Sequence, residues 1–177
     1  MKFKVLGVLL LSVLVLGACD DGNSENGEDV NVDSKPGEVS DYANNDSVSD
    51  DVSSKLNKLI TELPHYTTKA GDFANQLDDS PSLIKTVAFK QEFSDFLLEY
   101  ESFIKSLDAN PKTDADLELT KLLNDFTFET QMYIEQMRLY IKLGSYDYRA
   151  NANDHIIKRK ISANELVNKM EEYGIVK

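Results

Sequence analysis

The sequence has few of the side chains that most often carry enzyme chemistry. It contains one cysteine, two histidines and no tryptophan among 177 residues. A single cysteine cannot form an intramolecular disulfide, so the fold must depend on packing. Neither His65 nor His155 lies in an H-E-x-x-H motif, and no G-x-S-x-G, P-loop or dinucleotide-binding motif is present. We therefore predict no catalytic residue, no metal ion and no cofactor.

Basic residues are also scarce. The chain has 19 Lys and Arg against 31 Asp and Glu, for a net charge of −12. A nucleic-acid-binding domain needs a basic surface to neutralise phosphates, so we exclude nucleic acid as a partner. Eleven of the acidic residues fall in residues 20–51, which leaves residues 52–177 only mildly acidic.

Only one long apolar run is present, from Val5 to Leu16, and it follows Lys2 and Lys4. As a helix it would span roughly 18 Å, which is short of the ~30 Å hydrocarbon core of a bilayer. A basic start followed by a short apolar run is typical of a cleaved signal peptide. We predict that residues 1–18 form such a signal.

The residues that end this run are Leu16, Gly17, Ala18 and Cys19. They resemble the lipobox of bacterial lipoproteins. The resemblance implies that processing enzymes attach a diacylglyceryl group to the Cys19 sulfur and cleave between Ala18 and Cys19. Acylation of the new amino group stays open. Two or more acyl chains give stable anchoring, so the expected location is the extracytoplasmic face of the cell membrane. The alternative is an ordinary secretory signal with an incidental cysteine.

Residues 19–51 combine the cysteine with an acidic, polar segment that has almost no large apolar residue. Such a segment cannot bury enough apolar surface to offset its conformational entropy, so we predict a disordered tether. Its r.m.s. reach is roughly 30 Å for about 32 flexible residues. Calcium binding by its carboxylates is an alternative, but no EF-hand spacing supports it.

Residues 52–177 are predicted to form the folded domain. Apolar residues from Val52 to Leu77 recur at helical spacing, with Pro64 expected to kink or break that helix. Ser80 and Pro81 predict the start of a second helix. Its core stripe is Phe89, Phe93, Phe96, Leu97, Tyr100, Phe103, Ile104 and Leu107.

The third predicted helix is the longest. Thr113 is placed to cap it and Gly144 to end it. Besides its main stripe, it has a second apolar stripe, so we expect it to lie centrally and contact more than one neighbour. The second stripe consists of Phe128, Met132, Leu139 and Leu143.

The C-terminal region is less regular in sequence. Residues 145–161 show no clear period and are predicted to be a loop with a short helix. Ser162 with Glu165 predicts a capping box for a final helix, with Ile161 and Leu166 as a hydrophobic staple and Gly174 at its end.

No segment shows the period-two alternation of a strand, so the predicted fold class is all-α. An antiparallel bundle of three or four helices behind the tether buries these stripes. The layout resembles small uncharacterised lipoproteins of Gram-positive bacteria, in which a lipobox and a polar spacer precede a helical bundle.

Two groups are candidate partner contacts. The basic residues Lys158, Arg159 and Lys160 could touch an acidic lipid, polymer or protein, although a solvated connector explains them too. Tyr146 and Tyr148 could add surface contacts.

The carboxylates Glu92, Asp95, Glu99 and Glu101 could in principle supply an acid and base pair for glycoside cleavage. They lie mostly off the aromatic stripe, where water keeps carboxylates near their ordinary pKa, so a solvated face is favoured.

We expect a non-enzymatic module that binds an unknown envelope protein or polymer. The alternatives are a small-ligand carrier and an envelope enzyme or accessory without a linear motif.

Overall fold

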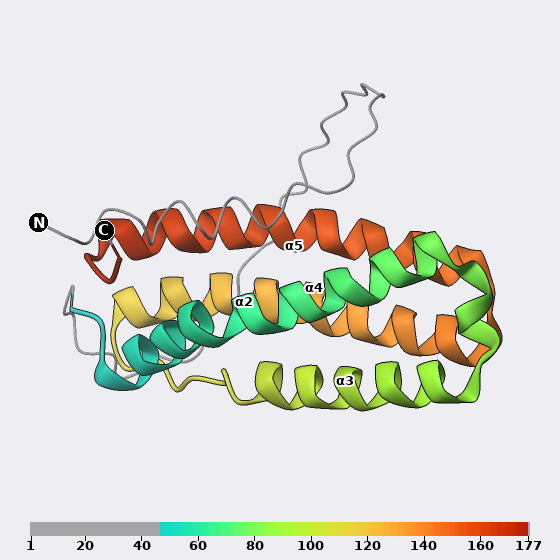
Figure 1. Cartoon of the computed structure of the whole chain (residues 1–177). Coiled ribbons are helices and arrows are strands. Elements are labelled where there is room, and N and C mark those ends of the chain that lie inside the picture. Colours follow the sequence, from blue (N-terminus) through green and yellow to red (C-terminus); the bar gives the residue numbers. More distant parts are fainter. Residues whose placement is uncertain (1–46, 177) are drawn as a thin grey trace, which may run out of the picture.

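A computed structural model describes residues 47–176 as an all-α bundle, as predicted (Figure 1). The predicted signal, Cys19 and most of the tether lie outside the described residues. No β-strand occurs within residues 47–176, and no helix there is long and apolar enough to cross a membrane. The elements are α2 (Asp50–Asp79), the 3₁₀ helix η1 (Pro81–Lys85), α3 (Val87–Lys105), α4 (Asp114–Leu143) and α5 (Tyr146–Glu172).

Helix α2 begins two residues before the predicted Val52 and is continuous over its 30 residues. Of the two outcomes expected at Pro64, a kink or a break into two pieces, the break does not occur. Pro64 is exposed, so its ring and the missing N–H lie on the solvent side and leave the buried face intact. The hydroxyl of Thr67 donates to the carbonyls of Leu63 and Pro64, both at 3.2 Å. The apolar stripe therefore keeps one register along the whole helix.

The predicted start of the second α-helix at Ser80 and Pro81 is wrong. These residues begin η1, with Pro81 at its first position, and α3 starts only at Val87. The N–H of Leu83 donates to the Ser80 carbonyl at 3.0 Å, and the N–H of Thr86 donates to the Leu83 carbonyl at 2.8 Å. These i to i+3 bonds form a tight 3₁₀ turn, which reverses the chain between α2 and α3.

An aromatic column between α2 and α3 forms much of the core. The rings of Phe73 and Phe93 stack with centroids 4.3 Å apart, and Tyr66 stacks on Tyr100 at 5.0 Å and on Phe103 at 4.6 Å. Aromatic pairs at such separations add to the stabilisation from area burial alone. The predicted stripe from Phe89 to Leu107 is confirmed, because all eight of its residues are buried, seven of them in α3 and Leu107 just after its end.

Helix α4 lies centrally, as predicted, and contacts α2, α3 and α5. The Thr113 hydroxyl accepts a hydrogen bond from the Asp116 N–H at 3.1 Å, and Gly144 ends the helix with a left-handed φ of 72°. The second stripe does not pack as expected. Phe128 and Leu143 are each 56% exposed, since both point away from the bundle.

Helix α5 corrects the prediction for the C-terminal region. It runs unbroken from Tyr146 to Glu172 and includes residues 145–161 except Ser145. Ser162 caps nothing, because it lies within the helix and its hydroxyl bonds the Lys158 carbonyl at 3.3 Å. The residues facing the bundle recur every three or four positions and are Ala152, Ile156, Arg159, Ala163, Leu166 and Met170.

The predicted staple does not form, since Ile161 is 57% exposed while Leu166 is buried. Gly174 closes the helix as predicted, with a left-handed φ of 69°. Its N–H donates to the Glu171 carbonyl at 3.0 Å, and the N–H of Ile175 donates to the Met170 carbonyl at 2.9 Å. These two bonds make a Schellman motif.

The chain enters the bundle at the end where the C-terminus also lies (Figure 1). The buried carboxylate of Asp116 accepts hydrogen bonds from the N–H of Ser49 at 2.8 Å and the N–H of Lys112 at 2.9 Å. Asp51 accepts another from the N–H of Asn110 at 2.9 Å. These bonds attach the start of α2 to the connection between α3 and α4.

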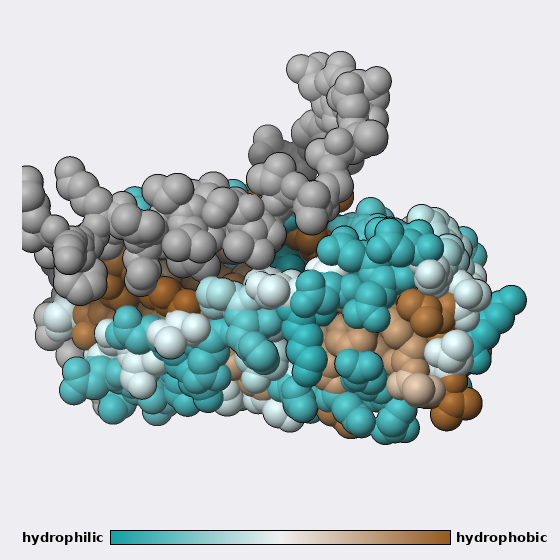
Figure 2. All heavy atoms as spheres, viewed as in Figure 1, coloured by the Kyte–Doolittle hydropathy of each residue, from teal (hydrophilic) through white to brown (hydrophobic). Residues whose placement is uncertain are grey.

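At the opposite end lie η1 and the turn between α4 and α5. Figure 2 shows hydrophilic residues over much of the described surface in that view, with apolar residues at the end that carries η1 and the start of α3 and also toward the end where the C-terminus lies. Val87 there is 84% exposed. Single exposed apolar residues are normal on a soluble domain, so this end by itself defines no site.

Asp116 generates a prediction about pH. Burial alone raises the pKa of Asp116, but the hydrogen bonds from Ser49, Lys112 and Thr113 outweigh it and hold the pKa below its ordinary value. The stabilisation from the ionised carboxylate is therefore present above about pH 4 and is lost as pH falls through the folded pKa.

We expect Asp116→Asn to lower the free energy of unfolding by about 1–3 kcal/mol at pH 7, since hydrogen bonds to a charged acceptor are the stronger kind. Urea unfolding followed by circular dichroism would measure this at pH 7 and at pH 3. The gap between variant and wild type should narrow at pH 3. A gap of the same size at both values would contradict the assignment.

Candidate functional site

The predicted basic contact surface does not form. Lys158 is exposed and Lys160 is half-buried, but Arg159 is only 6% exposed and points into the bundle. Successive helix residues are separated by about 100°, so three consecutive side chains cannot share one face. The prediction that Arg159 is a surface contact is therefore wrong, and the other two do not make a joint patch with it.

The two candidate tyrosines also separate. Tyr146 is 68% exposed at the start of α5, and the Arg149 guanidinium carbon lies 6.0 Å from its ring centroid. Tyr148 packs partly against the core. Arg149 forms an ion pair with Asp78, which connects the start of α5 to the end of α2. Tyr146 is therefore the more accessible of the two to a partner, while Tyr148 is half-buried.

Arg159 is the most unusual buried side chain. One guanidinium nitrogen donates to the Tyr100 hydroxyl at 2.9 Å, and the guanidinium lies 5.7 Å from the centre of the Tyr133 ring. No ion pair to Arg159 occurs within the described residues. Burial raises the pKa of Tyr133 to about 12 and also raises the pKa of Tyr100, so both phenols stay neutral. The cation is held by a hydroxyl and a ring face instead of a carboxylate.

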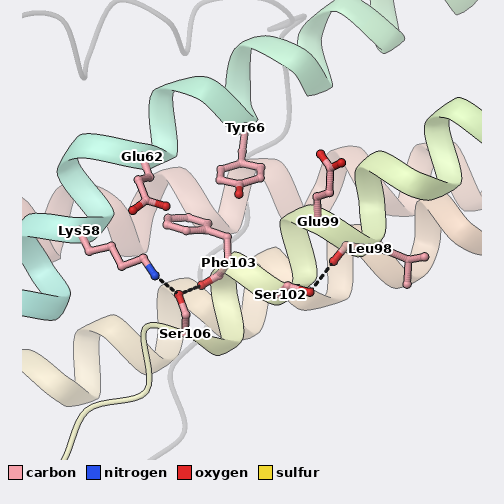
Figure 3. A pocket seen from close by; sticks show the side chains of 8 residues that line it. All are labelled: Lys58, Glu62, Tyr66, Leu98, Glu99, Ser102, Phe103 and Ser106. Carbon is pink, nitrogen blue, oxygen red and sulfur yellow. Dashed lines mark hydrogen bonds between the residues drawn. The ribbon is translucent and has the colours of Figure 1, made fainter.

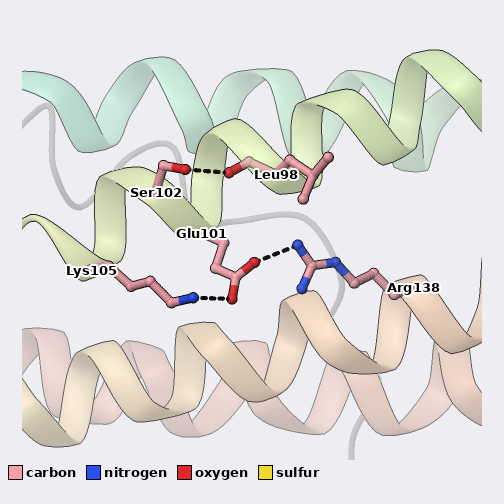
Figure 4. A network of polar contacts seen from close by, with 5 residues as sticks. All are labelled: Leu98, Glu101, Ser102, Lys105 and Arg138. Carbon is pink, nitrogen blue, oxygen red and sulfur yellow. Dashed lines mark hydrogen bonds and ion pairs between the residues drawn. The ribbon is translucent and has the colours of Figure 1, made fainter.

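The carboxylates that were weighed for catalysis do not form an acid–base pair. Glu101 bonds both Arg138 of α4 and Lys105 (Figure 4). Hydrogen bonds from these two cations lower the pKa of Glu101, whereas a general acid needs a raised one. Glu92 and Asp95 are exposed on α3. The Glu101 network is best explained as a connection between α3 and α4.

The histidines are also separated. His155 of α5 contacts Glu129 of α4, with Nδ1 and Oε2 2.6 Å apart, and both side chains are largely buried. His65 is exposed on α2, against the edge of Tyr66. No group of three or more His, Cys, Asp or Glu that could hold a metal ion occurs between residues 47 and 176.

A surface groove between α2 and α3 is the candidate site. Its volume is about 510 Å³, and it is wide open to solvent. On α2 its residues are spaced by four, which places them on one face over roughly 12 Å of helix. The lining residues are Lys58, Glu62, Tyr66, Leu98, Glu99, Ser102, Phe103 and Ser106.

The groove has an aromatic floor and polar sides (Figure 3). Tyr66 and Phe103 stack against each other, and Leu98 is 56% exposed along the α3 side. At one end the ammonium of Lys58 donates to the Ser106 hydroxyl at 2.8 Å. An aromatic and aliphatic surface edged by a few polar groups is the composition usual in binding sites.

The sequence held a signal for this groove that the prediction did not use. Lys58, Glu62 and Tyr66 recur at i, i+4 and i+8 beside the core stripe of α2. Such a series marks one helix face, but it cannot show which neighbouring helix lies across from it. That pairing depends on the reversal at η1, whose form the sequence pattern did not predict.

No protein-family model, curated protein or solved structure matches this chain. The class that the fold and the groove define is a small all-α bundle with an open amphipathic groove on one helix pair. Any assignment of function therefore depends on the residues of this chain alone.

Arg159 yields a prediction about stability. A buried cation without an anionic partner is costly, and an apolar side chain of similar length avoids that cost. We expect Arg159→Met to raise the free energy of unfolding by about 1 kcal/mol. Arg159→Ala should lower it by about 2 kcal/mol or more, because it leaves a cavity.

Urea unfolding of both variants beside the wild type measures these changes. If Arg159→Met were destabilised as much as Arg159→Ala, the prediction would be wrong. That result would mean that the contacts of Arg159 with the two tyrosines outweigh the cost of burying its charge.

Proposed function

We propose that this protein is a lipid-anchored lipoprotein that presents its helical bundle at the extracytoplasmic face of the cell membrane to bind another envelope macromolecule. The lipobox resemblance of Leu16 to Cys19 supports the anchor. The open groove between α2 and α3 is the observation that supports binding, because it combines exposed apolar surface with polar groups on a rigid helix pair.

The attachment of the tether suits this role. Hydrogen bonds that the Asp116 and Asp51 carboxylates accept from backbone N–H groups hold the start of α2 at one end of the bundle, so a tether would leave from a defined point. The tether has an r.m.s. reach of roughly 30 Å, so it would hold the bundle clear of the lipid head groups. The groove lies along the side of the bundle and would remain accessible in the anchored protein.

The anchor is tested by Cys19→Ser. Without the sulfur no diacylglyceryl group can be attached, so the variant should leave the membrane fraction, while Asn23→Ser, four residues downstream, should not. Fractionation followed by intact-mass measurement of the mature N-terminus reports both attachment and cleavage before residue 19. Equal membrane retention of both variants would refute a lipid anchor at Cys19.

Binding through the groove is tested by a photo-crosslinking amino acid at Leu98 in intact cells. We expect a discrete crosslinked species from this position and none from the same amino acid at Asn164, an exposed residue of α5. Excess bundle without the crosslinker should compete the species away. Equal yields from both positions, or no competition, would show that the groove is not the binding face.

A further inference from the structure

The charges at the groove specify its partner more closely. Glu62 extends from α2 and Glu99 from α3, so the carboxylates come from opposite walls with Tyr66 between them (Figure 3). Both glutamates are exposed. Burial raises the pKa of the Tyr66 hydroxyl, and the negative charges of Glu62 and Glu99 raise it further. The hydroxyl therefore lies in the field of both carboxylates.

The cations already near the groove do not fully neutralise it. Lys58 lies one helical turn from Glu62 (Figure 3), but its ammonium donates to the Ser106 hydroxyl and forms no ion pair with Glu62 among residues 47–176. Lys69 reaches Glu99 at 3.4 Å, which is long for an ion pair, and its ammonium also lies 5.2 Å from the centre of the Phe96 ring. Within residues 47–176, the Glu62 carboxylate forms no ion pair. One carboxylate is thus free and the other is loosely paired.

The apolar surface of the groove suits a long cationic side chain. Tyr66 is half-buried and Leu98 is exposed, so they offer apolar surface beside the carboxylates. A long cationic side chain lays its methylene stem on apolar surface while its charged head stays at the polar edge. A guanidinium can also donate to several oxygens at once, including two carboxylates and a hydroxyl.

We infer that the groove between α2 and α3 recognises an arginine side chain of the partner protein, held between Glu62 and Glu99 with its head at the Tyr66 hydroxyl. This inference rests on the proposed function, since it names the chemistry of the partner. Lysine is a weaker fit because its ammonium cannot bridge two separated carboxylates as a planar fork does.

The test uses the mature chain carrying Cys19→Ser and two blocked peptides, Leu-Arg-Leu and Leu-citrulline-Leu. Citrulline keeps the length and shape of arginine without its charge. NMR titration of the backbone amides locates and measures binding. We expect shifts centred on Tyr66, Leu98 and Ser102, and a Kd about five- to tenfold lower for the arginine peptide, as two exposed ion pairs allow.

Three variants are expected to change arginine binding in three different ways. Glu62→Gln with Glu99→Gln should remove the preference for arginine over citrulline. Lys69→Gln should strengthen arginine binding about twofold, because it removes the competing ammonium. Glu92→Gln, an exposed change on α3 outside the groove, should leave both affinities unchanged. Raising the salt concentration should weaken binding of the arginine peptide and leave binding of the citrulline peptide unchanged.

Equal affinity for the two peptides, or a preference that survives the double glutamine variant, would overturn this inference. Those results leave the proposed function standing if the Leu98 crosslink still captures a competable partner. Loss of the crosslink with a retained arginine preference would instead overturn the cellular role and keep the chemistry of the groove.

Discussion

The stacking of aromatic rings between α2 and α3 is the interaction on which the rest of the structure depends. Phe73, Phe93, Tyr66 and Phe103 join the two helices along much of their length. Wide rings stacked in this way fill the space between the helices from the inside and leave an open groove outside. The same column positions Tyr100, whose hydroxyl then accepts the hydrogen bond from Arg159 of α5. Core packing and the candidate site are therefore two sides of one arrangement.

Polar contacts also connect the helices. Asp116 and Asp51 attach the start of α2 to the connection before α4, and Glu101 joins α3 to Arg138 of α4. Each lies where two elements meet, so each helps to fix how those elements align, and the buried Asp116 carboxylate also contributes stability. The buried cation of Arg159 is the exception, since its desolvation is offset only by a hydroxyl and a ring. At this position the core holds a charged side chain where an apolar one would pack without a desolvation cost.

The sequence predicted the fold class, the stripe of α3, the Thr113 cap and the left-handed endings at Gly144 and Gly174, because each depends on local spacing or on one residue's backbone preference. It failed where tertiary contacts decided the outcome. Residues 146–161 form a regular helix, but two of their inward positions are held by Ala152 and Arg159, which a search for large apolar residues overlooks. Ser162 had the spacing of a cap, yet packing of the whole α5 face against α4 continued the helix through it.

What the sequence by itself determined is local and compositional: an apolar run followed by Leu16 to Cys19, an acidic and polar composition in residues 20–51, and helices with strong aromatic stripes. The tertiary structure alone decided which side chains share a surface. Lys158, Arg159 and Lys160 are neighbours in sequence but diverge around the helix. Glu62 and Glu99 lie 37 positions apart and meet across one groove. The physical reason is that periodicity shows which face of a helix is buried, whereas the partner of that face depends on how the chain reverses and on which rings stack.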